Sequence, residues 1–202
     1  MTAVSERPLT AVKTATKKLT VKQFLALGEI DGDENFYENY ELIDGEIVAK
    51  TRKKGPSGRH GEVINNLGGE LRNFVKAGKL GRVFVTSPCA FSENNYYIPD
   101  VAFVAKGRIS VLDFQGTVPV IPDLIAEINS PSDTIEQIHN KIEVYLKAGV
   151  RLIWSINLVD KYVFVYQTGE PERTYLSLKD ELDGGTVLPN FKLKVADLFE
   201  GE

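Results

Sequence analysis

The spacing of apolar residues along the chain changes several times between a helical and a strand-like period. Apolar positions recur every three or four residues in three segments, which predicts helices at 19–29, about 59–77 and about 133–148. Thr20 suits the N-cap of the first helix. Short runs rich in β-branched and aromatic residues predict strands. These runs are 40–50, 81–92, 96–105, 120–128, 151–157 and 161–168. Asp44-Gly45 predicts a tight turn inside the first of them. The segment from 175 on predicts one more strand or hairpin and a short terminal helix.

The predicted elements follow in the order helix, hairpin, helix, three strands, helix and further strands. This order predicts a mixed sheet with helices packed against it, which is an α/β or α+β fold. It excludes a doubly wound parallel fold, because too few helices separate the strands. A chain of 202 residues has the length of one domain. We expect that domain at 19–202, after a small, basic and disordered tail at 1–18.

Composition indicates which cellular environment the protein suits. No apolar run approaches the roughly 20 residues that a membrane span needs, so no membrane association is expected. The first residues lack the apolar core of a secretory signal. The single cysteine, Cys89, fits a reducing cytoplasm, and we expect it to be a small buried apolar residue rather than a catalytic thiol.

Charge is distributed unevenly along the chain. The net charge is −4, which is not the signature of a strong nucleic-acid binder. The segment Lys50–His60 nevertheless holds five Lys and Arg residues and no acid, whereas the last thirty residues lean acidic. Such a basic loop can contact phosphates, although a solvated loop is the simpler interpretation.

Two carboxylates interrupt apolar strand-like runs. Glu127 ends the run that begins at Leu124, and Asp100 follows Pro99 inside another. A buried ionised carboxylate is costly unless it is paired or bound to a metal. If the two strands are neighbours, both acids can converge on one hard cation such as Mg²⁺. The alternative is that Asp100 caps a turn and Glu127 pairs with an arginine.

The helix predicted after Glu127 carries a lysine at an unusual position. Asp133 and Glu136 have the spacing of a capping box. Lys141 lies at the edge of the apolar stripe, from where its long stem can bring the ammonium group to the strand ends. A lysine that only extends along the surface is the alternative. The stripe consists of Ile135, Ile138, Ile142, Tyr145 and Leu146.

These residues carry a resemblance to a known family. Pro99-Asp100 followed by Glu127-Ile128-Asn129 resembles the motif of the PD-(D/E)XK nucleases, with Asn129 in the place of the motif lysine. The chain resembles more specifically the Uma-two family of restriction endonucleases, of the cyanobacterial type, in which the lysine has moved to the following helix. The resemblance runs from about Leu19 to Phe199. It rests on the stretches YELIDGEIV, IPDVAFV, PDLIAEINSPSD, KIEVYLKAGVRLIWSIN and VLPNFKLKVADLF, and on His60 at a helix start.

The resemblance implies a restriction-endonuclease-like fold with extra β-hairpins and a metal-dependent endodeoxyribonuclease. Asp100, Glu127 and the carbonyl group of Ile128 would bind Mg²⁺, or Mn²⁺ in its place. Lys141 would orient or help to deprotonate the attacking water and would stabilise the charge that develops on the phosphate. Glu41 matches a further acidic position and would complete the metal site or hold Lys141; a hairpin acid facing solvent is the alternative. His60 would contact phosphate or act as acid or base, against a structural role at the helix start.

The remaining expectations concern the substrate and the partners. Asn129 shares strand parity with Glu127, so both side chains can point the same way, and Asn129 can hydrogen-bond substrate or an ordered water. Basic residues before the second helix would contact DNA phosphates without reading sequence; they are Arg52, Lys53, Lys54 and Arg59. A homodimer is expected by analogy. The rival hypothesis is a catalytically inactive DNA- or protein-binding module that retains the fold.

Overall fold

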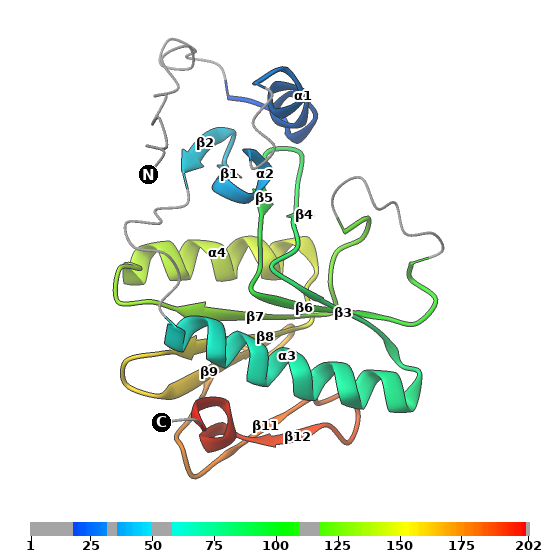
Figure 1. Ribbon diagram of the computed structural model, residues 1–202, viewed down its shortest axis with the longest axis vertical. Coiled ribbons are helices and arrows are strands. Elements are labelled where there is room, and N and C mark those ends of the chain that lie inside the picture. The colour runs from blue at the N-terminus through cyan, green and yellow to red at the C-terminus, as the bar shows by residue number, and fades with distance from the viewer. Residues whose placement is uncertain (1–17, 32–35, 50–57, 110–117, 201–202) are drawn as a thin grey trace, which may run out of the picture.

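The computed structural model describes residues 18–31, 36–49, 58–109 and 118–200 (Figure 1). The predicted tail up to residue 17, and Arg52, Lys53 and Lys54 of the basic loop, lie outside the described residues. In the described part, six strands form the central sheet in the order β10-β9-β8-β7-β6-β3. Their bounds are β3 Gly81–Val85, β6 Val101–Ala105, β7 Leu124–Asn129, β8 Leu152–Asn157, β9 Tyr162–Gln167 and β10 Thr174–Leu176.

The central sheet is mixed, as the sequence predicted. Strands β7 and β8 are parallel and are joined by a crossover through α4 (Ile135–Ala148), while the other neighbouring pairs are antiparallel. Helix α3 (Gly58–Gly78) packs on one face of the sheet and α4 on the other (Figure 1). The two helices thus bury alternate residues of each central strand. No described helix is long and apolar enough to cross a membrane.

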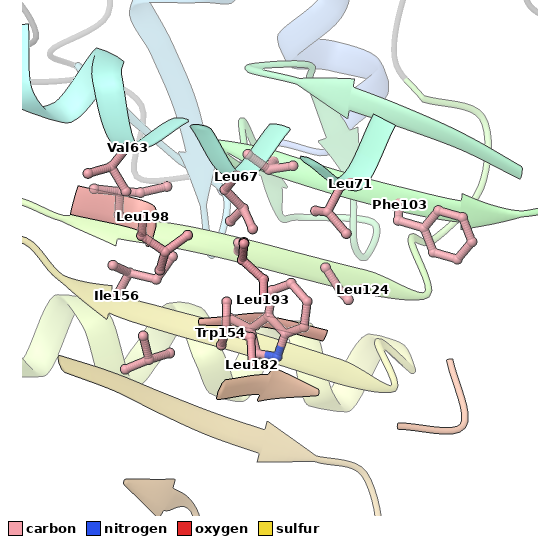
Figure 2. Packing of buried hydrophobic residues seen from close by; sticks show 14 of the residues in the cluster. Val63, Leu67, Leu71, Phe103, Leu124, Trp154, Ile156, Leu182, Leu193 and Leu198 are labelled. Atoms are coloured by element: carbon pink, nitrogen blue, oxygen red, sulfur yellow. The ribbon is translucent and has the colours of Figure 1, made fainter. Parts of the chain in front are cut away.

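The core on the α3 face is the larger of the two. Apolar side chains of α3 meet inward-facing residues of β7 and β8, and Trp154 stacks on Phe191 with 5.8 Å between ring centroids. The hairpin of β11 (Glu181–Asp183) and β12 (Lys192–Lys194), with the 3₁₀ helix η1 (Val195–Phe199), closes this face from below. Figure 2 shows Leu67 and Leu71 of α3 above the sheet, with Leu182 and Leu193 of the hairpin near Trp154.

A second, four-stranded sheet with the order β2-β1-β5-β4 lies on the α4 side of the central one (Figure 1). The predicted hairpin is confirmed: Asp44 and Gly45 both have positive φ, at 48° and 82°, as a tight two-residue turn requires. Thr20 caps the first helix as predicted, because its hydroxyl accepts a hydrogen bond from the backbone N–H of Gln23. The remaining bounds are α1 Val21–Asp31, α2 Phe36–Asn39, β1 Tyr40–Ile43, β2 Glu46–Ala49, β4 Cys89–Ala90 and β5 Tyr96–Tyr97.

Two predictions about strands need correction. The runs at 81–92 and 96–105 are each split into two strands, because part of each run joins the small sheet and part joins the central one. Asp100 therefore occupies a bend immediately before β6 and is not inside a strand. Cys89 is buried as expected, and burial raises the pKa of its thiol to about 12, which does not suit a nucleophile.

Two predictions about α4 are also wrong. The capping box is formed by Thr134 and Gln137 and not by Asp133 and Glu136; Asp133 instead accepts hydrogen bonds from Ser130 in the preceding turn. Ile135, assigned to the apolar stripe, is 87% exposed. The first turn of α4 extends past the sheet, so no described partner surface covers it.

Candidate active site

The register of the central sheet brings Asp100 next to Glu127. Val101 of β6 pairs with Ala126 of β7, so the residues one step beyond this pair, Asp100 and Glu127, lie side by side. Glu127 shares strand parity with Ile125, which packs on the α4 face of the sheet. Both acids are buried, with 9% and 8% of their surfaces exposed.

Asp100 and the backbone of Ile128 form one half of the site, with His60 between them. Asp100 Oδ2 accepts a hydrogen bond of 2.8 Å from the N–H of Ile128. His60 Nε2 lies 3.0 Å from the carbonyl oxygen of Ile128 and 3.5 Å from Asp100 Oδ2. The Asp100 carboxylate raises the pKa of His60, although burial acts in the other direction. Two acceptor oxygens therefore converge on the Nε2 atom of His60.

Glu127 forms the other half of the site. One of its carboxylate oxygens accepts a short hydrogen bond from the hydroxyl of Tyr145, and the other lies 3.7 Å from Lys141 Nζ. Burial raises the pKa of Glu127 to about 7, and the neighbouring Asp100 and Glu41 carboxylates add to the rise. Lys141 and Tyr145 oppose this shift without cancelling it. The negative charge of the site is thus incompletely compensated by the side chains around it.

Lys141 is held between two carboxylates and an aromatic ring. Its Nζ lies 3.3 Å from Glu41 Oε1 and 5.4 Å from the centroid of the Tyr97 ring. Glu41 is 5% exposed and also accepts a hydrogen bond from the backbone N–H of Ile98, so it is not a hairpin acid facing solvent. Burial alone would lower the pKa of Lys141, but the surrounding carboxylates outweigh it and raise the pKa. The side chain is therefore an ammonium ion at neutral pH.

The other candidate residues lie at different distances from this cluster. Asn129 donates a 2.7 Å hydrogen bond to the hydroxyl of Ser155, which is the direct neighbour of Glu127 on β8. Arg59 is exposed in the first turn of α3, directly before His60. The structure therefore brings Glu41, His60, Asp100, Glu127, the Ile128 carbonyl and Lys141 together, with Asn129 and Arg59 at the border.

Three residues of the site were not singled out from the sequence. Tyr145 was assigned to the apolar stripe of α4, yet its hydroxyl binds Glu127. Its position one turn after Lys141 on the same helix was the available signal. Tyr97 and Ser155 reach the site only through the pairing of strands that are distant in sequence, and no local pattern marks them.

The set of oxygen ligands fits a hard divalent cation. Glu41 and Glu127 contact the Lys141 ammonium group, and Asp100 Oδ2 and the carbonyl oxygen of Ile128 lie 3.5 and 3.0 Å from His60 Nε2. Such oxygen ligands suit Mg²⁺, which usually takes one or two carboxylates and completes its shell with water and phosphate oxygens. Among the described residues, no group of three or more His, Cys, Asp or Glu side chains is arranged to hold a metal ion, so the candidate cation site rests on two carboxylates and a backbone carbonyl.

Fold and relatives define the class of protein. A mixed sheet between two helices, with acids at the strand ends, is the restriction-endonuclease-like fold. A solved structure from Anabaena variabilis ATCC 29413, described as "a putative nuclease belonging to DUF820", is similar with a TM-score of 0.69 and 24% sequence identity, over 79% of this chain and 89% of that one. No curated protein matches the chain. The family model Uma2, "Putative restriction endonuclease", matches residues 21–196, and the chain belongs to this family.

Proposed function

We propose that the protein is a divalent-metal-dependent DNA endonuclease that hydrolyses phosphodiester bonds. The observation that carries the proposal is the cluster of three buried carboxylates, Glu41, Asp100 and Glu127, of which only Glu41 and Glu127 contact the ammonium group of Lys141. Such a cluster has no structural benefit comparable to its cost, because buried apolar residues of the same size would stabilise the sheet better. Membership of the Uma2 family supports the same reaction class.

Asp100, Glu127 and the Ile128 carbonyl are the residues that would hold Mg²⁺ or Mn²⁺. When bound, the cation supplies a more acidic water and neutralises charge on the scissile phosphate. Holding these oxygens at the ends of paired strands fixes their positions more tightly than a loop would. Tyr145 and the Ile128 N–H each hold one carboxylate in place by donating a hydrogen bond to it.

Lys141 would act as a fixed positive charge and not as a base. The raised pKa keeps the ammonium group protonated, so it cannot accept a proton from water. It can donate a hydrogen bond to the attacking water and stabilise the negative charge that develops on the phosphate oxygens. Glu41, anchored by the Ile98 N–H, holds the ammonium group toward Glu127.

His60 would have two tasks at the same position. Its Nε2–H neutralises part of the charge on Asp100 and the Ile128 carbonyl while no cation is present. Because only 19% of its side chain is exposed, it faces the site more than the solvent. When Asp100 and the Ile128 carbonyl bind the cation instead, the same N–H can be donated to a substrate phosphate.

A second candidate function is a DNA- or protein-binding module that has lost catalysis. Two observations favour it: the Lys141 ammonium is already engaged by two carboxylates, and Asn129, in the place of the motif lysine, is bonded to Ser155. A module of this kind would keep the fold and the ion pairs without turnover. A homodimer, which would allow both strands of a duplex to be cut, is part of the first proposal and can be checked by light scattering.

Cleavage of supercoiled and linear DNA with Mg²⁺ or Mn²⁺ separates the two candidates. We expect nicking that is lost in EDTA and in Glu127→Ala but retained in Glu136→Ala, which removes an exposed acid from the same helix as Lys141. Absence of cleavage with either metal would exclude the endonuclease. Charge reversal by Asp100→Lys, with DNA binding retained or strengthened and no cleavage by wild type, would establish the binding module.

A further inference from the structure

Four cationic side chains surround a hollow at the far end of α3. The hollow has a volume of about 450 Å³ and lies between the last turns of α3 and strand β3, which Figure 1 shows beside each other. No described acidic side chain lines it. The cationic residues are Arg72 and Lys76 on α3, Lys79 in the following turn and Arg82 on β3, and we call them the basic groove.

The basic groove differs from the ion-paired cations in the described part of the chain. Arg108 and Arg151 are paired with Asp123, Lys192 with Asp183, and Lys141 with Glu41. None of the four groove residues forms an ion pair with a described acid. Their mutual repulsion is therefore relieved only by salt or by an external anion. On a chain with a net charge of −4, such a local excess of positive charge does not follow from composition.

We infer that the basic groove binds the phosphate backbone of duplex DNA on one side of the scissile bond. The inference rests on the proposed nuclease function. At about 1.5 Å per residue, Lys76 lies roughly 24 Å along α3 from His60, which stands in the candidate active site. At about 3.4 Å per base pair, this span corresponds to roughly seven base pairs of duplex. The two ends of α3 thus contact the same duplex at separate phosphates.

The arrangement of the groove suits a polymer better than a single anion. A site for one phosphate draws several donors onto one point, often from buried groups or a helix N-terminus. Here the four side chains are exposed and are spread over a helix, a turn and a strand at the C-terminal end of α3. Long flexible cations at such spacing bind consecutive phosphates without reading the bases. Along the face between groove and site, α3 exposes Gly61 and Asn65, with Gly69 and the acidic Glu62 half-buried beside them, so no bulky exposed side chain blocks a rigid duplex on this face.

Binding of a fluorescein-labelled duplex of about 20 base pairs, measured by anisotropy in EDTA, tests the inference without cleavage. The full-length double variant Arg72→Gln/Lys76→Gln is compared with Lys22→Gln/Lys179→Gln, which removes the same charge from exposed positions elsewhere. We expect roughly a tenfold or greater loss of affinity in the groove variant only. The slope of log Kobs against log salt is expected to fall by about 1 for each phosphate that the variant no longer neutralises.

Three results would overturn the inference. They are an unchanged affinity in the groove variant, an equal loss in both double variants, and no measurable binding by the wild type at about 50 mM salt. Circular dichroism confirms folding, and Lys79→Gln/Arg82→Gln provides a second groove variant outside the helix. Groove-dependent binding without any metal-dependent cleavage would reject the proposed function and support the inference. Cleavage combined with groove-independent binding would support the proposed function and reject the inference.

Discussion

At the residue scale, Glu127 and Asp123 show how one strand can bury two acids with opposite consequences. Glu127 lies within β7 and Asp123 directly precedes it, and 8% and 2% of their surfaces are exposed. Asp123 Oδ1 lies 2.7 Å from both Arg108 Nη1 and Arg151 Nη2, and Asp123 Oδ2 accepts a hydrogen bond from the Ala105 N–H. Glu127 shares a single ammonium group with another acid. The first arrangement stabilises the folded chain, and the second compensates the charge of Glu127 only in part.

Tyr145→Phe is expected to raise the pKa of Glu127 above about 7 in the metal-free protein. The Tyr145 hydroxyl donates its hydrogen bond to the carboxylate, so its loss destabilises the ionised form. The shift can be followed by NMR titration of ¹³C-labelled glutamate. Tyr166→Phe, on the α4 face but hydrogen-bonded to Arg173 at a distance from the site, is the control. An unchanged midpoint in Tyr145→Phe would show that the hydroxyl does not stabilise the carboxylate.

Asp123→Asn is expected to destabilise the protein near neutral pH by about 1–3 kcal/mol, because two half-exposed arginines lose their charged hydrogen-bond acceptor. Burial would raise the pKa of Asp123, but hydrogen bonds from Ala105, Arg108 and Arg151 outweigh it and lower the pKa. Because its folded pKa is depressed, Asp123 stabilises the protein at pH values above its unfolded pKa of about 3.9. This contribution is lost as the pH falls through the folded pKa.

Urea unfolding at several pH values measures this contribution. The difference between wild type and Asp123→Asn is expected to be largest above about pH 5 and to shrink as the pH falls below about 4. Glu136→Gln, which changes an exposed acid, is expected to show little difference at any of these values. A difference that grew toward low pH would contradict the assignment of Asp123 as the ionised partner.

At the element scale, the helices, the hairpin and the strand runs could be predicted because each has a local signal. The spacing of apolar residues predicted α3 to within a residue, and Asp44-Gly45 predicted the turn of β1 and β2. The division of strands between two sheets could not be predicted, because it depends on pairing partners distant in the sequence. The exposure of Ile135 has a similar cause, since helical periodicity does not reveal where the covering sheet ends.

The positions of Asn129 and Glu127 on one face of β7 lead to a rescue experiment. Lys141→Ala is expected to reduce cleavage by about 10²–10³-fold, as does the loss of other groups that stabilise a transition-state charge. Adding Asn129→Lys to this variant places an ammonium group at the motif position. We expect the double variant to recover at least about tenfold in the rate of supercoiled-DNA nicking, a difference of about 1.4 kcal/mol in the barrier.

The control for this rescue is Asn140→Lys in the Lys141→Ala background. It adds the same charge to an exposed position of α4, directed away from the sheet. Recovery in Asn140→Lys would indicate a general charge effect on DNA binding. No recovery in Asn129→Lys, with the protein folded, would mean that the loss of the hydrogen bond to Ser155 outweighs the added charge, or that the helix-borne geometry of Lys141 is required.

At the scale of the whole molecule, the site joins parts of the chain that no local pattern connects. Glu41 comes from the small sheet, His60 from the start of α3, Glu127 from the central sheet and Lys141 from α4. The sequence could nominate these residues one by one, through their residue types and their resemblance to the Uma-two family. It could not show that Glu41 is buried against Lys141, because that contact depends on how the small sheet docks on the central one.

The ionised Glu127 carboxylate that would bind a cation is expected to lower the stability of the metal-free protein. Its folded pKa of about 7 is raised above the unfolded value, so the folded state retains a proton that the unfolded state has already lost. The free energy of unfolding of the metal-free protein should therefore decrease as the pH rises from about 4.5 to about 7, and stay low above it. Glu127→Gln has no such proton to lose, so it is expected to be more stable than wild type at about pH 8 and similar to it at about pH 5.

Mn²⁺ should reverse the order of stability of wild type and Glu127→Gln at about pH 8. A ligand that binds only the folded state at about 100 times its Kd stabilises the protein by about 2.7 kcal/mol. In the proposed metal site this gain requires the Glu127 carboxylate. Thermal unfolding at about pH 8 is therefore expected to give a higher Tm for Glu127→Gln than for wild type in EDTA, and a rise with Mn²⁺ in wild type alone. A Glu127→Gln protein that is less stable in EDTA at this pH would show that the Lys141 and Tyr145 contacts fully compensate the buried charge, in which case the carboxylate is structural.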